Sequence, residues 1–331
     1  MAPSLESLWR DAQHAHLAGD MARVQRSLRA AIDIAPQFGD AYFELANTLS
    51  AGGRTQEAVL GYRAALRTGT VGDVPMAHNN LGNTLADIGD LEAATREYKR
   101  GLRLAPTFTY LHNGLANVFT SQSRNAEAAA TLARAIRVRP TAHYAYYNLG
   151  NALRRMQRFP EAEAAFVSAI RAVPDDGRYS QGLGQLCHET KRLSEAVAFY
   201  AAAEDQLASK GWARSAPLER DHASALREAK RYDEAVHRAH EAQRLEPDGV
   251  AGLSTLTTVL RDAMRLEEAA VYHQREALAD VRTAAATANE ADKAAAVMAY
   301  AAQAARARHR IMGRLVLFCR PSYSGERPDV P

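Results

Sequence analysis

Apolar residues recur at helical spacing through most of the chain, and short polar breaks interrupt them at regular intervals. In one stretch, Leu81, Leu85 and Ile88 share one face of a helix. A second apolar series begins after Gly89 and Asp90. Spacings of three and four residues are those of an amphipathic helix, Gly can end a helix in the left-handed conformation, and Asp can cap the next. The pattern therefore predicts two helices joined by a tight turn.

The same helix pair recurs with a period of 34 residues. Pro106, Pro140 and Pro174 stand 34 residues apart, and each closes a similar segment. A fixed period in this range is typical of stacked supersecondary units. Small residues hold one place in the first helices, where neighbouring helices approach closely; they are Ala46, Gly82, Ala116, Gly150, Gly184 and Ala223. Counting outwards predicts eight helix pairs within residues 4–280.

Two intervals exceed the period. The interval that ends at Pro106 measures 36 residues because residues 68–75 lengthen a link, and a later interval of 39 residues contains the insertion 209–217. Such insertions either change the direction of the array or are tolerated at its surface. The sequence leaves both alternatives open.

The pattern changes after residue 280. Residues 281–312 are rich in alanine and predict one helix that caps the array, as solenoids require. Residues 313–331 form an extended tail, whose apolar run at 315–319 predicts a strand followed by a loop. The tail is either a strap against the last helix or the first strand of a domain that the chain lacks. The alanine-rich helix also leaves a homodimer open.

Composition and charge exclude several classes of protein. The 41 Lys and Arg residues are balanced by 38 Asp and Glu residues, which are interspersed and leave a net charge of +3. This is not the basic patch of a nucleic-acid-binding protein. No apolar run reaches the ~18 residues of a membrane span, and Glu6, Arg10 and Asp11 stand where a signal peptide is apolar. Two cysteines are too few for a disulfide framework, so we expect a cytoplasmic protein.

The segment that ends at Pro174 resembles the tetratricopeptide repeat. The residues that carry this resemblance are Leu149, Gly150, Leu153, Ala162, Phe166, Ala169 and Pro174. The resemblance covers residues 4–280 and implies an all-α fold: a right-handed superhelical solenoid of about eight antiparallel helix pairs, here followed by the capping helix. In this family the first helix of each pair lines the concave side. The resemblance therefore places binding residues on the first helices.

Asparagines occupy three recurring positions of the first helices. Asn47, Asn83, Asn117 and Asn151 share one position, Asn80 and Asn148 another, and Asn79 and Asn113 a third. A carboxamide both donates and accepts, so a column of them can pair with the backbone of an extended peptide. An asparagine ladder has that role in the repeat region of the protein O-linked N-acetylglucosamine transferases, which this pattern resembles. Gly114 and Gly182 interrupt the ladder here, and the asparagines either contact a ligand or only bond neighbouring helices.

Aromatic and basic residues extend the candidate surface. Tyr110, Tyr144 and Tyr147 lie on first helices, and tyrosine is favoured at interface hot spots, although in a helical array it also serves as a core residue. Arg154 either pairs with an acidic group of a ligand or is solvated. Some family members clamp a terminal carboxylate with basic residues, but Phe43 and Tyr110 occupy those places here. This disfavours a receptor for chaperone tails.

Sequence motifs for catalysis or for a metal site are lacking. His237 and His240 lie three residues apart, a spacing that suits a metal, but no Cys, Asp or Glu completes a set. The sequence contains no phosphate-binding loop, nucleophile elbow or zinc-protease motif. We therefore expect no enzymatic activity, no cofactor and no metal.

The sequence thus predicts a scaffold that binds an extended segment of a partner protein in a concave groove. The predicted peptide-binding residues are Asn47, Asn79, Asn80, Asn83, Tyr110, Asn113, Asn117, Tyr144, Tyr147, Asn148, Asn151 and Arg154. The alternative is the amino-terminal substrate-recognition module of a glycosyltransferase with tetratricopeptide repeats. Its catalytic domain would begin at the strand predicted for residues 315–319.

Overall fold

The computed structural model describes residues 3–287 of the chain, which form sixteen helices and no strand. The helices make eight pairs, and a turn of three residues joins the two helices of each pair. This confirms the predicted all-α array of paired helices. The chain divides into two compact units, residues 1–174 and residues 175–331. In residues 3–287 no helix has both the length and the apolar character that a membrane crossing needs.

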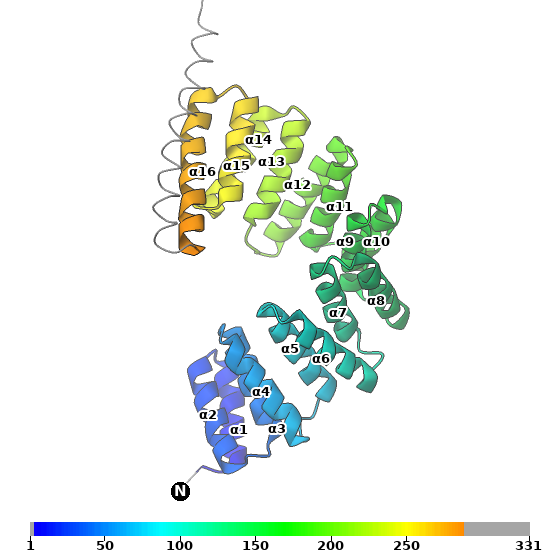
Figure 1. Ribbon diagram of the computed structural model, residues 1–331, viewed down its shortest axis with the longest axis vertical. Coiled ribbons are helices and arrows are strands. Elements are labelled where there is room, and N and C mark those ends of the chain that lie inside the picture. Colours follow the sequence, from blue (N-terminus) through cyan, green and yellow to red (C-terminus); the bar gives the residue numbers. More distant parts are fainter. Residues whose placement is uncertain (1–2, 288–331) are drawn as a thin grey trace, which may run out of the picture. The chain divides into compact units, whose positions relative to one another are not determined.

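The first unit contains five helix pairs, stacked in chain order (Figure 1). Each second helix packs against the first helix of the next pair, and from α3 onwards successive first helices also touch. Each pair therefore shares its core with its neighbours, as in repeat proteins. The helices are α1 (Leu5–Leu17), α2 (Met21–Ile34), α3 (Gly39–Ala51), α4 (Thr55–Thr68), α5 (Val74–Asp87), α6 (Leu91–Leu104), α7 (Thr109–Ser121), α8 (Asn125–Val138), α9 (His143–Arg155) and α10 (Phe159–Ala172).

The second unit contains three helix pairs within its described residues. They are α11 (Gly177–Glu189) with α12 (Leu193–Ser209), α13 (Ala216–Glu228) with α14 (Tyr232–Leu245), and α15 (Val250–Asp262) with α16 (Leu266–Thr287). Helix α12 has 17 residues where α10 has 14, so a longer helix takes up part of the later insertion. Of the expected capping helix 281–312, residues 281–287 belong to α16. The remainder, and the tail 313–331, lie outside the described residues.

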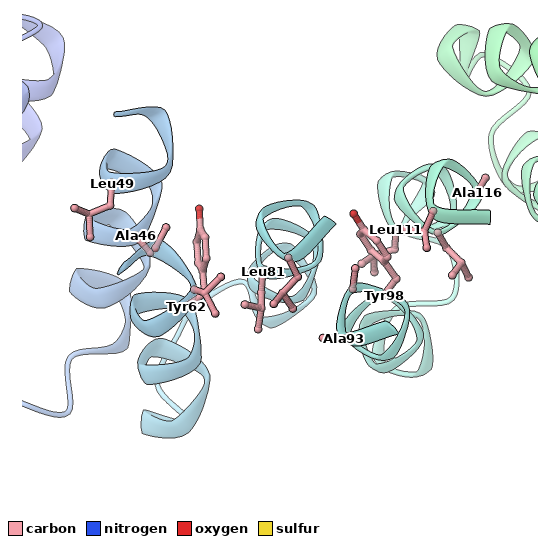
Figure 2. Close-up of a cluster of buried hydrophobic side chains, with 14 of the residues drawn as sticks. Ala46, Leu49, Tyr62, Leu81, Ala93, Tyr98, Leu111 and Ala116 are labelled. Carbon is pink, nitrogen blue, oxygen red and sulfur yellow. The ribbon is translucent and has the colours of Figure 1, made fainter. Parts of the chain in front are cut away.

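Small residues at the closest helix contacts make room for tyrosine rings. Ala46 is fully buried, and a Cβ atom added at Gly82 would lie 2.7 Å from the ring of Tyr98. Tyr62 and Tyr98 are almost fully buried in one cluster with Leu81 (Figure 2). Because protein interiors are close-packed, a ring on one helix fits only where the helix that it packs against carries a small residue.

The turns within the pairs follow the predicted chemistry in part. Gly89 has a φ of 84°, and the Asp90 carboxylate accepts a hydrogen bond of 3.0 Å from the backbone N–H of Ala93, which confirms both predicted roles. Most other second helices begin instead with an arginine that pairs with a glutamate three residues later. These pairs are Arg54–Glu57, Arg124–Glu127, Arg158–Glu161, Arg192–Glu195, Arg231–Glu234 and Arg265–Glu268.

The link between α4 and α5 packs against the preceding pair. Val71 is buried, and the Thr70 hydroxyl donates a hydrogen bond of 2.5 Å to the backbone oxygen of Gln37. The backbone N–H of Gly72 donates to the Asp40 carboxylate at 2.8 Å. The longer interval in the sequence is thus a structured segment of the first unit.

Candidate binding face on the first helices

All twelve predicted binding residues lie on the first helices of four successive pairs in the first unit: α3, α5, α7 and α9. On α5, α7 and α9 most of them stand three or four residues apart, and only Asn79–Asn80 and Tyr147–Asn148 are adjacent, so they share one broad side of each helix. We call this side the first-helix face. It consists of the twelve predicted residues.

The junction between α3 and α5 is closed by a carboxamide bridge. The Asn80 amide donates a hydrogen bond of 3.0 Å to the side-chain oxygen of Asn47, and the Tyr62 hydroxyl donates to the same oxygen at 2.7 Å. The Asn47 amide donates to Glu44 at 3.3 Å, and the buried Asn79 amide donates to Asn80 at 3.2 Å. Both Asn47 and Asn79 therefore bond within the protein.

A second bridge closes the junction between α7 and α9. The Asn148 amide donates to the side-chain oxygens of Asn113, at 2.7 Å, and of Asn117, at 3.3 Å. Asn148 stands at the position of Asn80, and Asn117 at that of Asn47. The two bridges are equivalent, because in each an asparagine reaches back to the preceding first helix.

At the junction between α5 and α7, the ring of Tyr98 takes the place of an asparagine bridge. The Tyr98 hydroxyl donates a hydrogen bond of 2.6 Å to the side-chain oxygen of Asn83. A Cβ atom at Gly114 would collide with the Tyr98 ring. Gly114, which interrupts the asparagine ladder of the sequence, is therefore required by packing.

On the exposed part of the first-helix face, the internal hydrogen bonds of two asparagines leave their NH2 groups available as donors. The side-chain oxygens of Asn83 and Asn117 accept internal hydrogen bonds, which orients each carboxamide. Among residues 3–287 neither Nδ2 group contacts an acceptor, and both side chains are exposed. The half-buried Asn151 occupies the equivalent place on α9. Asn83 and Asn117 can thus donate to a bound molecule without releasing their internal partners.

Burial disfavours the ionised form of the supporting tyrosines, which are protonated at neutral pH. It raises the pKa of Tyr62 to about 12, although a side-chain hydrogen bond from the asparagine cluster acts in the opposite direction. Burial also raises the pKa of Tyr98. Both hydroxyls therefore remain donors at neutral pH, and they hold the asparagine oxygens in place.

The predicted tyrosines form two separate groups. The ring of Tyr110 stacks on that of Tyr144, with centroids 5.3 Å apart and planes 11° apart, and it also contacts Phe108 at 5.7 Å. Tyr110 is 48 % exposed. Tyr147 is half-buried, and its ring packs against Phe166 at 5.9 Å. Arg154 is half-buried at the last turn of α9.

An equivalent junction in the second unit was not predicted from the sequence. The Gln185 amide donates a hydrogen bond of 2.7 Å to the Asp221 carboxylate, and the Gln181 amide contacts the same oxygen at 3.4 Å. Gln185 and Asp221 stand at the positions that Asn117 and Asn148 hold in the first unit. Their places in the repeat were the available signal, but their residue types differ from the asparagine pattern.

Potential metal ligands are not clustered in the described part of the chain. There, His, Cys, Asp and Glu form no group of three that could hold a metal ion. His240 packs edge-on against Tyr272 at 5.7 Å, and burial lowers its pKa. The side chain of Cys187 is fully buried.

Comparison with known proteins identifies the repeat. The family model of the tetratricopeptide repeat matches residues 43–108, 79–144, 113–166 and 147–210, which together span about half of the chain. No curated protein sequence matches the chain.

Solved structures share the fold at low sequence identity. A tetratricopeptide repeat protein from Parabacteroides merdae is 17% identical with a TM-score of 0.64, over 77% of this chain and 98% of that one. A chain of the APC/C hetero-tetramer Cut9–Hcn1 is 16% identical with a TM-score of 0.61, over 82% of this chain and 52% of that one. Yeast Tom70 is 15% identical with a TM-score of 0.59, over 87% of this chain and 61% of that one. At such identities the likeness extends to the fold alone.

Proposed function

We propose that this chain, which belongs to the tetratricopeptide repeat family, is an interaction scaffold that binds an extended segment of a partner protein across its first-helix face. Tetratricopeptide repeats generally act as scaffolds for protein–protein interaction, and an all-helical array of this kind is typically not enzymatic. The proposal adds the surface and the form of the ligand to this general role.

The observation that supports the proposal is the pair of oriented, exposed amide donors on Asn83 and Asn117. Each oxygen is held internally by Tyr98 or Asn148, while each NH2 group has no acceptor among the described residues. A peptide backbone offers carbonyl oxygens as acceptors whatever its side chains are. The two donors lie on successive first helices, so a segment that crosses the helices can meet both.

An isosteric exchange at these two positions tests the proposal. Asn83→Asp and Asn117→Asp keep the oxygen that accepts from Tyr98 and Asn148 but replace the donor with an acceptor. Alanine would be less informative, because it would leave the Tyr98 hydroxyl without its acceptor. We expect the double variant to bind its partner about ten-fold more weakly or worse, because two net hydrogen bonds are lost.

The partner is first captured from a lysate with the immobilised chain and identified by mass spectrometry, and its binding segment is then measured by calorimetry. Gln56→Glu, on the exposed side of α4, adds one negative charge outside the first-helix face and serves as the control for each single exchange. Unchanged affinity of the double variant, together with a lower unfolding midpoint, would show that these asparagines serve the fold alone.

The glycosyltransferase module has no supporting observation in the described residues. It rests on the strand predicted for residues 315–319, which lie outside them. Sequencing the gene beyond Pro331 tests this alternative, because an open reading frame with an α/β pattern would favour it.

A further inference from the structure

We infer that the segment bound on the first-helix face is proline-rich and adopts the polyproline II conformation, with its prolines against the ring of Tyr110. This inference rests on the proposed function and adds the chemical class of the ligand. It is carried by an aromatic cluster, Phe108, Tyr110 and Tyr144, and by the hydrogen-bond character of the neighbouring asparagines.

The aromatic cluster is held rigid from below. The Tyr144 hydroxyl and the Thr109 hydroxyl are 2.5 Å apart, and Thr109 is buried. Tyr144 in turn carries the stacked ring of Tyr110, which Phe108 contacts with its plane tilted by 59°. Tyr110 is thus fixed by two other rings while 48 % of its surface stays exposed. A pre-organised aromatic ring loses little conformational entropy when a ligand packs against it.

The asparagines of the face favour a ligand that accepts hydrogen bonds and donates few. The side-chain oxygens of the exposed Asn83 and Asn117 accept from Tyr98 and Asn148, whereas neither NH2 group has an acceptor among the described residues. An extended β-like segment presents one N–H for each carbonyl and would need acceptors as well. Proline has no N–H, and the polyproline II helix has no internal hydrogen bonds, so its carbonyls remain available.

The spacing of the repeats also fits this conformation. Successive first helices α5, α7 and α9 touch one another, and packed helices lie about 8–10 Å apart. A polyproline II helix repeats every three residues, or about 9.3 Å, whereas the two-residue repeat of a strand is about 6.7 Å. Equivalent side chains of a polyproline II segment can therefore meet equivalent positions on successive first helices.

The surroundings of the aromatic cluster disfavour a cationic ligand. Within residues 3–287, the ring and hydrogen-bond contacts of Phe108, Tyr110 and Tyr144 are to one another, to Thr109 and to His143, and they include no carboxylate. A lysine or arginine held over a ring would lack a counter-ion there. Uncharged prolines need none, and docking of such segments on aromatic surfaces is an established mode of recognition.

Synthetic peptides with blocked ends test the inference directly. Three fluorescent peptides of ~12 residues are titrated with the full chain up to about 1 mM: one with prolines at two of every three positions, one proline-free and polar, and one with arginine at every third position. We expect the proline-rich peptide to bind measurably and the other two peptides not to bind. Tyr110→Ala should weaken it about ten-fold, whereas Tyr110→Phe should keep it.

Leu60→Ala is the matched control, because Leu60 is a 65 % exposed apolar residue on α4, outside the first-helix face. Equal binding of the proline-free peptide, a preference for the arginine peptide, an unchanged affinity of Tyr110→Ala, or no binding by any peptide would each overturn the inference. The proposed function stands or fails separately, because the Asn83 and Asn117 variants are assayed with the captured partner and not with these peptides.

Discussion

The ring of Tyr98 determines which residues the neighbouring first helices can carry. It lies against Gly82 of its own pair and Gly114 of the next, and its hydroxyl holds Asn83. Where the preceding pair places Tyr62, the next first helix carries Asn80 instead of glycine. The Tyr62 ring thus coexists with an asparagine, whereas the Tyr98 ring occupies the space that a side chain at position 114 would fill.

Adding one methyl group at Gly114 should be costly. In Gly114→Ala the new Cβ meets the Tyr98 ring, and overpacking of this kind destabilises a core by about 1–3 kcal/mol. We expect urea unfolding, followed by circular dichroism, to show that loss. Combining the variant with Tyr98→Leu should recover part of it, because the shorter side chain frees the space.

Gly52→Ala is the control for this experiment. Gly52 has a φ of −83°, and an added Cβ would lie 3.5 Å from the nearest backbone atom, which is ordinary contact. We expect a change within about 0.5 kcal/mol. Equal losses at Gly52 and Gly114 would contradict the packing argument.

The sequence identifies the asparagine positions but not the direction of their hydrogen bonds. The position of Asn83 in the repeat predicts that it lies on a first helix. Its oxygen is engaged because the hydroxyl of Tyr98, fifteen residues later, reaches it. Such a pairing depends on how the second helix crosses the first, which a periodic pattern does not specify. Ligand contact by the asparagines therefore stays a prediction.

At the scale of the helix pair, the turn places one residue in the left-handed conformation. Glycine fills this place in three pairs, at Gly19, Gly53 and Gly89, but five other residues adopt it elsewhere. They are Ser123, Gln157, Lys191, Lys230 and Met264, with φ values of 59–63°. A side chain in this region is strained by about 1–2 kcal/mol, which packing of the pair must offset.

Relieving that strain should stabilise the second unit. In Lys230→Gly the strain at φ 63° disappears, while the more flexible unfolded chain takes back about 0.5–1 kcal/mol. We expect a net gain of about 0.5–1 kcal/mol in denaturant unfolding. Lys230 is exposed, so little packing is lost. Lys230→Ala keeps the strain and should show no gain; an equal gain for both variants would contradict this account.

Helix pairs were the most predictable elements of this chain. The period gave all eight, because each repeats the same apolar spacing and turn. The arginine that opens most second helices was not foreseen, since it pairs with a glutamate and does not cap backbone N–H groups. The length of α12 was not foreseen either, because its last turn leads into an insertion that has no counterpart in the period, and it ends at Ser209, the first residue of that insertion.

At the scale of the whole molecule, each unit contains a buried glutamate in a different electrostatic setting. Burial disfavours the charge of Glu97, but His78 at 2.8 Å and Arg100 at 2.6 Å outweigh it and lower its pKa. Glu219 is fully buried, and burial together with the negative charge of Glu204 raises its pKa despite Arg238 at 3.4 Å. The stability contributions of these two glutamates should therefore respond to acid in opposite directions.

Replacing Glu97 or Glu219 with glutamine tests whether the two glutamates respond to pH in opposite directions. The contribution of Glu97 is present above its ordinary pKa of ~4.3 and is lost as pH falls through its lowered value, so Glu97→Gln should destabilise at pH 7 and less so in acid. The contribution of Glu219 is present below that ordinary pKa and is lost as pH rises through its raised value. Glu219→Gln should therefore stabilise at neutral pH, by an amount on the order of 1 kcal/mol, and not in acid.

Hydrogen exchange followed by mass spectrometry reports on α5–α6 and on α13–α14 separately, which matters because repeat arrays open locally. Pepsin fragments at neutral pH and at about pH 4 are compared for the wild type and both variants. Changes of the same sign for the two variants would refute the opposite response. The division at Pro174 that separates these units was not predictable, because the period passes through that residue unchanged.

The fit of the Tyr98 ring against Gly114 also restricts how such an array can lengthen by duplication. A tandem copy of α5–α6 would set a tyrosine against an asparagine, the combination that Tyr62 and Asn80 already make. A tandem copy of α7–α8 would set Leu132 against Gly114, and the shorter side chain would leave a void where the ring now lies. A copy of α5–α6 is thus compatible with the packing, whereas a copy of α7–α8 would weaken it, so the pairs are not equally interchangeable.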